Sequence, residues 1–376
     1  MTQRILHIID TLQRGGTQTS LLQLATGLPP DRFEVHVAVL EEAGSGDAVG
    51  SIESNLRAAD IPVTFIGRRH RIDPLTYARL RFFVKRRRPA LVHNWGFAAN
   101  SYGRSAALAA KVKAVVADES CVDTWKQWYH LAVDRRLTNM TSRVVVHSHS
   151  VRDFYIAQGI PAEKITLIAS GVAAHPTPSP DAISREDLLA LLQLPSDARL
   201  IGALGGISRR KQLRDVVWAE ELLRVVRDDV HLLIIGDGPD RQDLMRYRDQ
   251  VGLRKRVHFL GHREDALDLL NHIEMLLLGS RHEGMSYPIL EAMAAGLPVI
   301  CSDIPGNREL VVPEETGYLV PVGARAGLAR YANILLDDTD LAKQLGEAGR
   351  ARVTSQFSLA RMIAAHSSLY HELLGA

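Results

Sequence analysis

Short apolar segments alternate with helical patterns along most of this chain, and this alternation limits the fold more than any other feature. Each apolar segment has the length of a buried strand, and most are followed by apolar residues at helical spacing. In the first half the candidate strands are residues 5–9, 35–40, 63–66, 91–93, 114–117, 144–146 and 165–168. Strands that alternate with helices form a mainly parallel sheet with helices on both faces. The sequence therefore predicts an α/β fold of the doubly wound type.

The alternation stops at a proline-rich segment and then begins again. Pro176, Pro178 and Pro180 exclude a helix or a central strand there, so we expect a semi-rigid linker. The candidate strands of the second half are residues 200–204, 232–235, 257–260, 275–278, 298–301 and 318–320. The two halves are therefore similar α/β units.

The length of the chain also favours two domains. Single cores stop growing at roughly 250–300 residues, and this chain has 376. We expect a first domain at residues 1–174, a linker region at 175–198 and a second domain at 199–357. The C-terminal helix, residues 358–376, is expected to pack back on the first domain.

Composition narrows the class of protein. The formal net charge is +2, so the chain does not show the basic excess of nucleic-acid-binding proteins. Cys121 and Cys301 lie far apart and match no metal-type spacing, which favours a reduced, cytoplasmic protein. No apolar run approaches the roughly 18 residues of a membrane span. Residues 1–10 have a strand pattern rather than that of a signal peptide.

One segment is strongly basic. Between residues 68 and 88, Asp73 is the single acid among the cations Arg68, Arg69, Arg71, Arg79, Arg81, Lys85, Arg86, Arg87 and Arg88. A solvated helix face is one interpretation. The other is a patch that rests on anionic lipid, which would place the protein peripherally on the inner face of a membrane. Interleaved apolar residues fit either interpretation.

Residues 280–303 combine a loop and a helix start that suit an anion. A buried-strand segment ends at Gly279, so Glu283 lies in a loop at the carboxyl end of a strand. Pro288 predicts the first turn of a helix, with Ser286 or Tyr287 as its cap. Glu291 then falls in the first turns of that helix, and Gly296 ends it.

The N–H groups near Gly284, Met285 and Ser286 would point outward, and the helix dipole would add positive potential. Such a site binds phosphate. Glu283 and Glu291 would repel phosphate and are better placed to accept hydrogen bonds from hydroxyls. An anion site beside hydroxyl acceptors describes a sugar nucleotide. The alternative is an ordinary capped helix with two surface glutamates.

Two glycine-rich loops follow first strands. Gly15 and Gly16 permit close approach of a ligand, but they lack the third glycine of a dinucleotide fingerprint, which argues against a dehydrogenase. A plain tight turn is the alternative. In the second half, clustered cations after Gly206, including Lys211, again suit phosphate.

Other polar residues follow strands in the first half. His93 and Glu119 fall at the carboxyl ends of candidate strands, where such sheets bind ligands, although a lone histidine there is more often structural. Trp125, Trp128 and Tyr129 would line an acceptor cleft or form a core stripe.

These motifs together resemble the retaining glycosyltransferases of family 4, which have the GT-B architecture. The resemblance is carried by Glu283 and Glu291, separated by seven residues within HEGMSYPILEAMAAGLPVICSD. It is supported by Gly15-Gly16, Lys211, the segments IGDGP at 235–239 and FLG at 259–261, and the C-terminal helix. It implies two facing Rossmann-like domains, with a sugar nucleotide held mainly by the second.

The resemblance also implies roles for single residues. Glu291 would accept hydrogen bonds from the ribose hydroxyls, and Glu283 from the sugar hydroxyls. The amides of Gly284, Met285 and Ser286 would lie near the sugar and the diphosphate. In addition, Lys211 would bind the diphosphate and Arg263 would lie near the base.

The chain departs from the family pattern at several positions. Gly206 occupies the place of a usual arginine, and Arg209 or Arg210 would replace its charge. Gln212 follows the lysine where the family has glycine. Glu119 stands where several members have a histidine that contacts the transferred sugar. The expected catalytic residues are therefore Lys211, Glu283, Arg210 and Glu119. The expected donor-binding residues are Gly15, Gly16, Gly206, Arg209, Lys211, Arg263, Glu283, Gly284, Met285, Ser286 and Glu291.

The predicted reaction moves a sugar from a nucleoside diphosphate to a hydroxyl of a glycan or lipid-linked acceptor, with retention of configuration. It needs no cofactor and no metal, because cations and amides offset the leaving-group charge. The alternatives are a binding-only partner of another transferase, favoured by Gly206 and Glu119, and a sugar-nucleotide epimerase. A glycosidase is disfavoured because its carboxylates would not flank an anion site.

Overall fold

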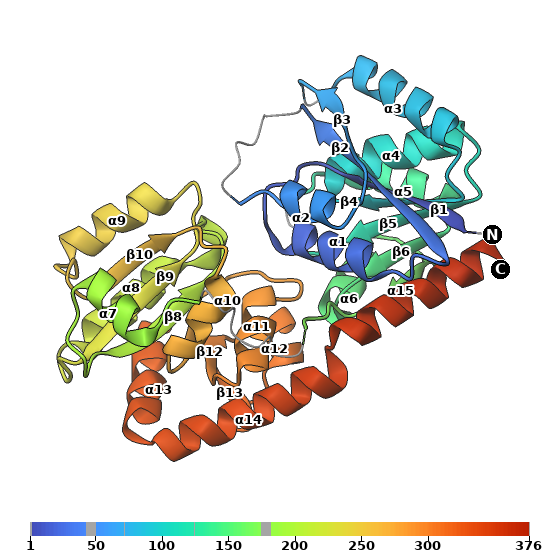
Figure 1. Cartoon of the computed structure of the whole chain (residues 1–376). Coiled ribbons are helices and arrows are strands. Elements are labelled where there is room, and N and C mark those ends of the chain that lie inside the picture. Colours follow the sequence, from blue (N-terminus) through green and yellow to red (C-terminus); the bar gives the residue numbers. More distant parts are fainter. Residues whose placement is uncertain (1, 43–49, 71, 124, 174–181, 376) are drawn as a thin grey trace. The chain divides into compact units, whose positions relative to one another are not determined.

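The computed structural model describes residues 2–42, 50–70, 72–123, 125–173 and 182–375. The chain forms two compact units, the first made of residues 1–171 and 359–376 and the second of residues 172–358. Each unit contains one parallel sheet covered by helices (Figure 1). This confirms the prediction of an α/β protein with two Rossmann-like domains.

The first unit has a seven-stranded sheet in the order β3-β2-β1-β4-β5-β6-β7. Every pair of neighbouring strands in it is parallel. The strands are β1 (Gln3–Ile9), β2 (Phe33–Glu41), β3 (Val63–Arg68), β4 (Leu91–Trp95), β5 (Ala114–Glu119), β6 (Arg143–Val146) and β7 (Ile165–Leu167). The central strands β1 and β4 are almost fully buried because both faces of the sheet are covered.

Helices cover the two faces of this sheet in separate layers. One layer holds α1 (Gly16–Gly27), α2 (Glu53–Ala58) and the C-terminal α15 (Leu359–Leu374), which share one apolar core. The other layer holds α3 (Pro74–Arg87), α4 (Phe97–Ala109) and α5 (Trp128–Met140), with α4 in contact with both neighbours. The remaining helices are α6 (His149–Ala157) and the short 3-10 turn η1 (Ala162–Lys164).

The second unit has a six-stranded sheet in the order β10-β9-β8-β11-β12-β13. Its strands are β8 (Arg199–Leu204), β9 (Val230–Ile235), β10 (Val257–Gly261), β11 (Leu276–Leu278), β12 (Val299–Ser302) and β13 (Gly317–Val320). The α-helices are α7 (Arg185–Leu192), α8 (Leu213–Leu223), α9 (Arg241–Gln250), α10 (Ala266–Leu269), α11 (Tyr287–Ala295), α12 (Pro305–Leu310), α13 (Arg325–Asp337) and α14 (Thr339–Gln356). Two 3-10 turns, η2 (Arg209–Lys211) and η3 (Leu270–His272), complete the unit.

The predicted linker region, residues 175–198, includes regular structure. Its proline-rich part falls in residues 174–181, which lie outside the described residues, as does Arg71 of the basic segment. Within the linker region, residues 185–192 form α7 rather than a connector. The Ser184 side chain accepts a hydrogen bond from the amide of Asp187, and Leu188 and Leu189 are buried against the second sheet. Capping and burial therefore stabilise a helix inside the region that we assigned to the linker.

Candidate active site

The candidate site lies where the second sheet changes direction. β8 comes first in this sheet along the chain, with β9 and β10 on one side and β11, β12 and β13 on the other. The connections after β8 and β11 therefore lead away from each other at the carboxyl ends of these neighbouring strands. Open α/β sheets bind their ligands at such a point.

Backbone hydrogen bonds join three loops at this edge. The amide of Gly205 donates to the carbonyl of Ile235 at 2.9 Å. The amide of Ile207 donates to the carbonyl of Asp237, also at 2.9 Å. The amide of Arg281 donates to the carbonyl of Arg210 at 2.9 Å. The loops after β8, β9 and β11 are therefore held as one assembly.

Glycines allow these loops to approach so closely. A Cβ atom on Gly236, whose φ is +139°, would lie 2.1 Å from the carbonyl oxygen of Gly205. A Cβ atom on Gly306 would lie 2.6 Å from the carbonyl oxygens of both Glu283 and Gly284. Any larger residue would displace a backbone segment, so both positions require glycine.

Lys211 and Glu283 form the charged centre of the site. Nζ of Lys211 donates to Oε1 of Glu283 at 2.6 Å, and both side chains are almost fully buried. Lys211 is the last residue of η2, and Gln212 reverses the chain into α8 with a φ of 48°. The hydroxyl of Ser280 donates to the same carboxylate oxygen at 2.7 Å. Ser280 was not predicted as a site residue from the sequence, although it lies three residues before Glu283 in the same loop.

These partners keep Glu283 ionised. Burial opposes the charge, but the cations of Lys211 and Arg210 and the hydrogen bonds from Lys211 and Ser280 outweigh it and lower the pKa of Glu283. The guanidinium of Arg210 lies 3.9 Å from the other carboxylate oxygen and is half exposed. The site thus pairs a buried carboxylate with one buried cation, Lys211, and one that also faces the solvent, Arg210.

Helix α11 begins directly after this carboxylate. Ser286 is the residue before its first turn, and Pro288 lies within that turn. The hydroxyl of Ser286 does not cap the helix, and this buried group has no hydrogen-bond partner among the described atoms. The first amides of a helix also lack intrahelical partners. A buried hydroxyl and a helix N-terminus next to Lys211 form donors for an anionic ligand.

Glu291, Arg209 and Arg263 are also predicted to bind the donor, and they differ in burial and in their partners. Glu291 is half-buried within α11, on a later turn than Ser286. Arg209 is almost fully exposed, with Nε 4.0 Å from a carboxylate oxygen of Asp240. Arg263 donates two hydrogen bonds to the carboxylate of Asp265, at 2.7 and 2.6 Å. Arg263 is therefore already paired with an acid in the free protein.

Comparison with known families decides the class. The family model described as Glycosyl transferases group 1 matches residues 184–352, and the model described as Glycosyltransferase Family 4 matches residues 14–175. Together they cover both units. This chain belongs to the GT-B glycosyltransferases of the family 4 type. The predicted resemblance is thereby confirmed.

Individual relatives of this family 4-type glycosyltransferase extend the comparison. N-acetyl-alpha-D-glucosaminyl L-malate synthase of Bacillus anthracis is 34% identical over 44% of this chain and 43% of its own length. The chain spans about half the length of the first curated relatives. The Escherichia coli UDP-Gal:alpha-D-GlcNAc-diphosphoundecaprenol alpha-1,3-galactosyltransferase is 25% identical over 99% of this chain and 97% of its own.

The fold of this glycosyltransferase also matches solved structures. The Anabaena protein Alr3699/HepE, crystallised in complex with UDP-glucose, superimposes with a TM-score of 0.84. The alignment covers 99% of both chains at 22% identity. This likeness shows the shared fold.

Glu119 of the glycosyltransferase lies in a buried charged cluster of the first unit. Its carboxylate accepts hydrogen bonds from Tyr155 at 2.6 Å, Lys126 at 3.2 Å and Asn100 at 3.0 Å. Lys126 also donates to Asp134 at 2.9 Å. Burial raises the pKa of Glu119 to about 7, although the ammonium of Lys126 acts in the opposite direction. Lys126 and its contacts were not predicted from the sequence, because the residues involved lie on β5, on the loop before α5, and on α5 and α6.

The glycine pair of the first unit opens helix α1. Gly15 precedes the helix and Gly16 is its first residue, at the carboxyl end of β1. The hydroxyl of Thr17 donates to that of Ser120 at 3.4 Å, which connects this loop to the end of β5. The glycosyltransferase thus brings Gly15 and Gly16 to the same sheet edge as Glu119.

His93 belongs to the core of the glycosyltransferase. It is fully buried, and its Nδ1 lies 2.7 Å from the hydroxyl of Tyr370 on α15. The rings of His7 and His366 lie at 5.6 and 5.9 Å from it, centroid to centroid. Burial, together with the neighbouring His7, lowers the pKa of His93 well below its usual value. This arrangement supports the structural interpretation of His93.

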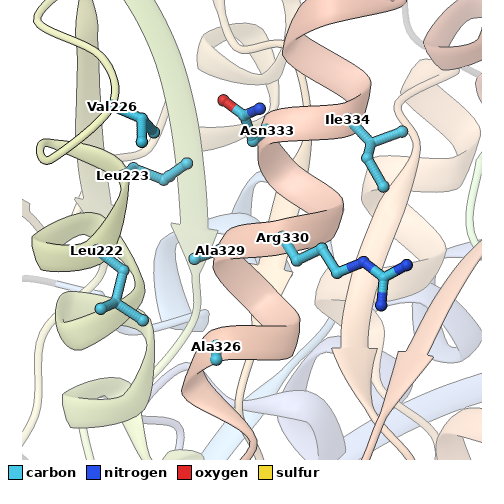
Figure 2. Close-up of a pocket in the computed structure, with 8 residues that line it drawn as sticks. All are labelled: Leu222, Leu223, Val226, Ala326, Ala329, Arg330, Asn333 and Ile334. Atoms are coloured by element: carbon cyan, nitrogen blue, oxygen red, sulfur yellow. The ribbon is translucent and has the colours of Figure 1, made fainter.

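A cavity on the second unit lies apart from the candidate site. It has a volume of about 360 Å³ and lies between α8 and α13 (Figure 2). It is lined by Leu222, Leu223, Val226, Ala326, Ala329, Arg330, Asn333 and Ile334. These residues of α8 are at the opposite end of the helix from Lys211, about 15 Å along its axis. The cavity therefore does not belong to the charged centre.

The described residues contain neither a metal-type cluster nor a membrane-spanning helix. No group of three or more histidine, cysteine, aspartate or glutamate side chains in the described ranges could hold a metal ion. None of the helices there is long and apolar enough to cross a membrane.

Proposed function

We propose that this glycosyltransferase transfers a sugar from a nucleoside diphosphate to an acceptor hydroxyl with retention of the anomeric configuration. The observation that carries the proposal is the buried Lys211–Glu283 pair beside the start of α11. It places a cation, helix amides and an unpaired hydroxyl next to a carboxylate. The cation, the amides and the hydroxyl suit a diphosphate, and the carboxylate suits the hydroxyls of a sugar.

In the proposed reaction the bond between the anomeric carbon and the diphosphate oxygen breaks. The acceptor oxygen forms the new bond on the same face, and its proton leaves with the diphosphate. Negative charge grows on the leaving group, and Lys211, Arg210 and the amides of residues 284–286 offset that charge. No metal is required in this proposal, because these groups supply the positive potential.

We assign the remaining donor contacts by position. Glu283 accepts hydrogen bonds from sugar hydroxyls, and Glu291 accepts them from the ribose. Gly206 gives the diphosphate room, because a Cβ atom there would meet nothing closer than the carbonyl of Asp237 at 3.8 Å. Arg209 adds positive charge at the entrance of the site. Arg263 lies near the base when it exchanges its hydrogen bonds to Asp265 for contacts with the nucleotide.

Glu119 and the glycine pair are proposed to act on the first unit. A carboxyl group whose pKa is about 7 can exist in either form near neutral pH. We propose that Glu119 hydrogen-bonds a hydroxyl group of a substrate and that Gly15 and Gly16 allow that substrate to approach the backbone.

We propose a uridine diphosphate sugar as the donor and a lipid-linked glycan as the acceptor. The E. coli relative that aligns over nearly the whole chain is named for a UDP-sugar and a diphosphoundecaprenol acceptor. The Anabaena structure with the same fold holds UDP-glucose. A lipid-linked acceptor would place the protein peripherally on the inner face of a membrane.

The test is a thermal-shift series with UDP, GDP, ADP and their sugars, followed by transfer assays with the nucleotide that binds. Ligand at 100 times its Kd stabilises the folded state by about 2.7 kcal/mol, which is easily measured. Transfer to a lipid-linked glycan, with the product linkage assigned by NMR, would support the proposal. Absence of any nucleotide effect would refute it.

Two other outcomes favour the alternatives. Tight nucleotide binding without transfer to any acceptor would favour a binding-only partner, a possibility that Gly206 keeps open because the family usually has a cation there. A new sugar nucleotide formed without acceptor would identify an epimerase.

A further inference from the structure

Helix α3 of the first unit has two apolar stripes on opposite sides. Thr76, Leu80 and Val84 are buried and face the sheet. Leu75 and Phe82, two helical turns apart, are 72% and 66% exposed. Residues at this spacing share one face of a helix, so Leu75 and Phe82 form an outward crest opposite the buried stripe. The core does not explain this crest.

Cations surround the crest. The cations of α3 are Arg79, Arg81, Lys85, Arg86 and Arg87, and the helix contains no acidic residue. Arg79 lies 3.9 Å from the carboxylate of Asp73, which caps the helix. Within the described ranges, Arg81, Lys85 and Arg86 form no ion pair. Within the part of the chain that the structure describes, the charges of these three residues are therefore not neutralised by ion pairs.

A second exposed apolar group lies at the start of α5 and in the turn before it, on the other side of α4. Trp128 is 76% exposed, and Trp125 and Tyr129 are about half exposed. The Trp125 ring packs edge-on against Phe97 at 5.0 Å and against His130 at 5.3 Å. Lys126, between Trp125 and Trp128, donates hydrogen bonds to Glu119 and Asp134 in a buried cluster, which fixes this segment on the first unit. The aromatic side chains are thus presented by a firmly held segment.

Both groups lie in one layer and at one end of the sheet. α4 contacts α3 on one side and α5 on the other, and Figure 1 shows α3 and α4 together over the first sheet. α3 follows β3 and α5 follows β5, so both helices begin near the carboxyl ends of parallel strands. Leu75 and Trp128 therefore lie toward the sheet edge that also holds Gly15 and Glu119.

We propose that the α3–α5 face, defined by Leu75, Phe82, Trp125, Trp128 and the α3 cations, docks on an anionic lipid bilayer. Single apolar side chains set among cations suit insertion between charged headgroups. Trp and Tyr favour the membrane–water interface. A protein interface would instead have an apolar centre depleted of charge. Nucleic acid would leave the Leu75–Phe82 crest exposed.

This docking would bring the carboxyl edge of the first sheet to the lipid surface. A lipid-linked acceptor could then reach Glu119 without leaving the bilayer, and this consequence rests on the proposed function. The docking itself does not, because it depends only on surface residues of the first unit.

The experiment is cosedimentation of the full chain with vesicles of phosphatidylcholine, alone or mixed with an equal amount of phosphatidylglycerol. We expect binding to the anionic vesicles that weakens as salt is raised. Replacing Arg81, Lys85 and Arg86 together by glutamine should weaken it about 100-fold, since each cation near the surface contributes about fivefold. Leu75→Ser with Phe82→Ser should weaken it at least tenfold, and Trp128→Ser should weaken it less.

The matched control is Val225→Ser with Val226→Ser, because these side chains on the second unit are 76% and 69% exposed. This control should bind vesicles as the parent does. Equal binding to neutral and anionic vesicles, or binding that survives the α3 changes, would overturn the proposal. So would equal losses in the control, or a stronger preference for double-stranded DNA competing in the same assay.

The thermal shift produced by UDP, measured for each variant, separates this proposal from the proposed function. An unchanged shift in an α3 variant shows that it is folded and that its donor site is intact. Vesicle binding without any nucleotide effect would leave docking in place and remove the transferase proposal. A thermal shift with UDP but no vesicle binding would leave the transferase proposal in place and remove the docking proposal.

Discussion

Nζ of Lys211 lies 2.6 Å from Oε1 of Glu283, although 72 positions separate the two residues in the chain. The contact joins the loop after β8 to the loop after β11, which are neighbouring strands. It keeps a carboxylate ionised in a buried place, because the cation offsets the cost of burial. The donor site therefore depends on both members of the pair for its charge and its shape.

Replacing Lys211 by alanine should lower turnover by about 10²–10³, the usual loss when one donor to a developing charge is removed. The same change leaves Glu283 buried without its main cation, so the free energy of unfolding should fall by about 3–5 kcal/mol. Steady-state kinetics and urea unfolding measure the two effects.

A double variant, Lys211→Met with Glu283→Gln, is the control for this prediction. It removes both charges, so most of the lost stability should return while turnover stays low. Recovery of turnover in the double variant, or near-normal turnover in the alanine variant, would contradict the proposed role of Lys211.

Glu291→Ala should raise the KM for the donor with little change in kcat, because the proposed contact to the ribose is equal in the ground state and the transition state. Donor titrations at saturating acceptor measure this effect. A large fall in kcat at unchanged KM would place Glu291 in the chemical step instead.

Gly306→Ala should weaken donor binding at least tenfold. The added Cβ would lie 2.6 Å from the carbonyl oxygens of Glu283 and Gly284, so the loop that carries Glu283 must move. Gly349→Ala, on α14 of the same unit, is the matched control, since its Cβ would come no closer than 3.4 Å, to the flexible side chain of Met293. Isothermal titration with UDP should show a loss in the first variant and near-parent affinity in the second.

Glu220→Gln should stabilise the second unit above mildly acidic pH. Glu220 is fully buried on α8, and neither carboxylate oxygen has a hydrogen-bond partner among the described atoms. Burial raises the pKa of Glu220 well above its usual value of 4.5. The contribution of Glu220 to stability is therefore most favourable below pH 4.5 and is lost as pH rises toward the folded-state pKa. The variant lacks this loss. Its free energy of unfolding, relative to that of the parent, should therefore increase by up to about 1.4 kcal/mol for each pH unit above 4.5.

Urea unfolding between pH 4 and pH 8 tests this prediction. Glu221→Gln, next to Glu220, removes a surface ion pair with Arg224 and should not reproduce the gain. A variant advantage that is constant across this range would show that Glu220 does not titrate as inferred.

His366→Gln should make the first unit less sensitive to acid. His366 is fully buried on α15, and burial lowers its pKa from 6.5 to about 4. The folded-state pKa is depressed, so the unfolded chain binds a proton more readily between pH 6.5 and about pH 4. Stability is therefore lost as pH falls through this window. The variant should show a shallower fall, with a cost at pH 7.5 of about 1 kcal/mol for the lost hydrogen bond.

The control for this variant is His371→Gln, which changes an exposed histidine of the same helix. Its unfolding profile should follow that of the parent. An unchanged acid profile in His366→Gln would show that another group sets the acid sensitivity.

Local patterns were sufficient for much of the architecture. The alternation of strands and helices, the stop of α11 at Gly296 and the C-terminal helix at residues 359–374 all follow from spacing, capping and glycine chemistry within a few residues. The loop position of Glu283 and the family resemblance also came from contiguous sequence. The extent of the linker did not, because α7 is stabilised by burial against a sheet that is distant in sequence.

Other features exist only in the folded chain. The order of the strands makes β8 and β11 neighbours, and this alone brings Lys211 to Glu283. The partners of Glu119 come from α4, the loop before α5, and α6, and those of His93 include Tyr370 of α15. Sequence spacing carries no information on such pairs, because they depend on which crossovers place distant segments side by side. The charge and pKa of each buried group follow from those long-range contacts.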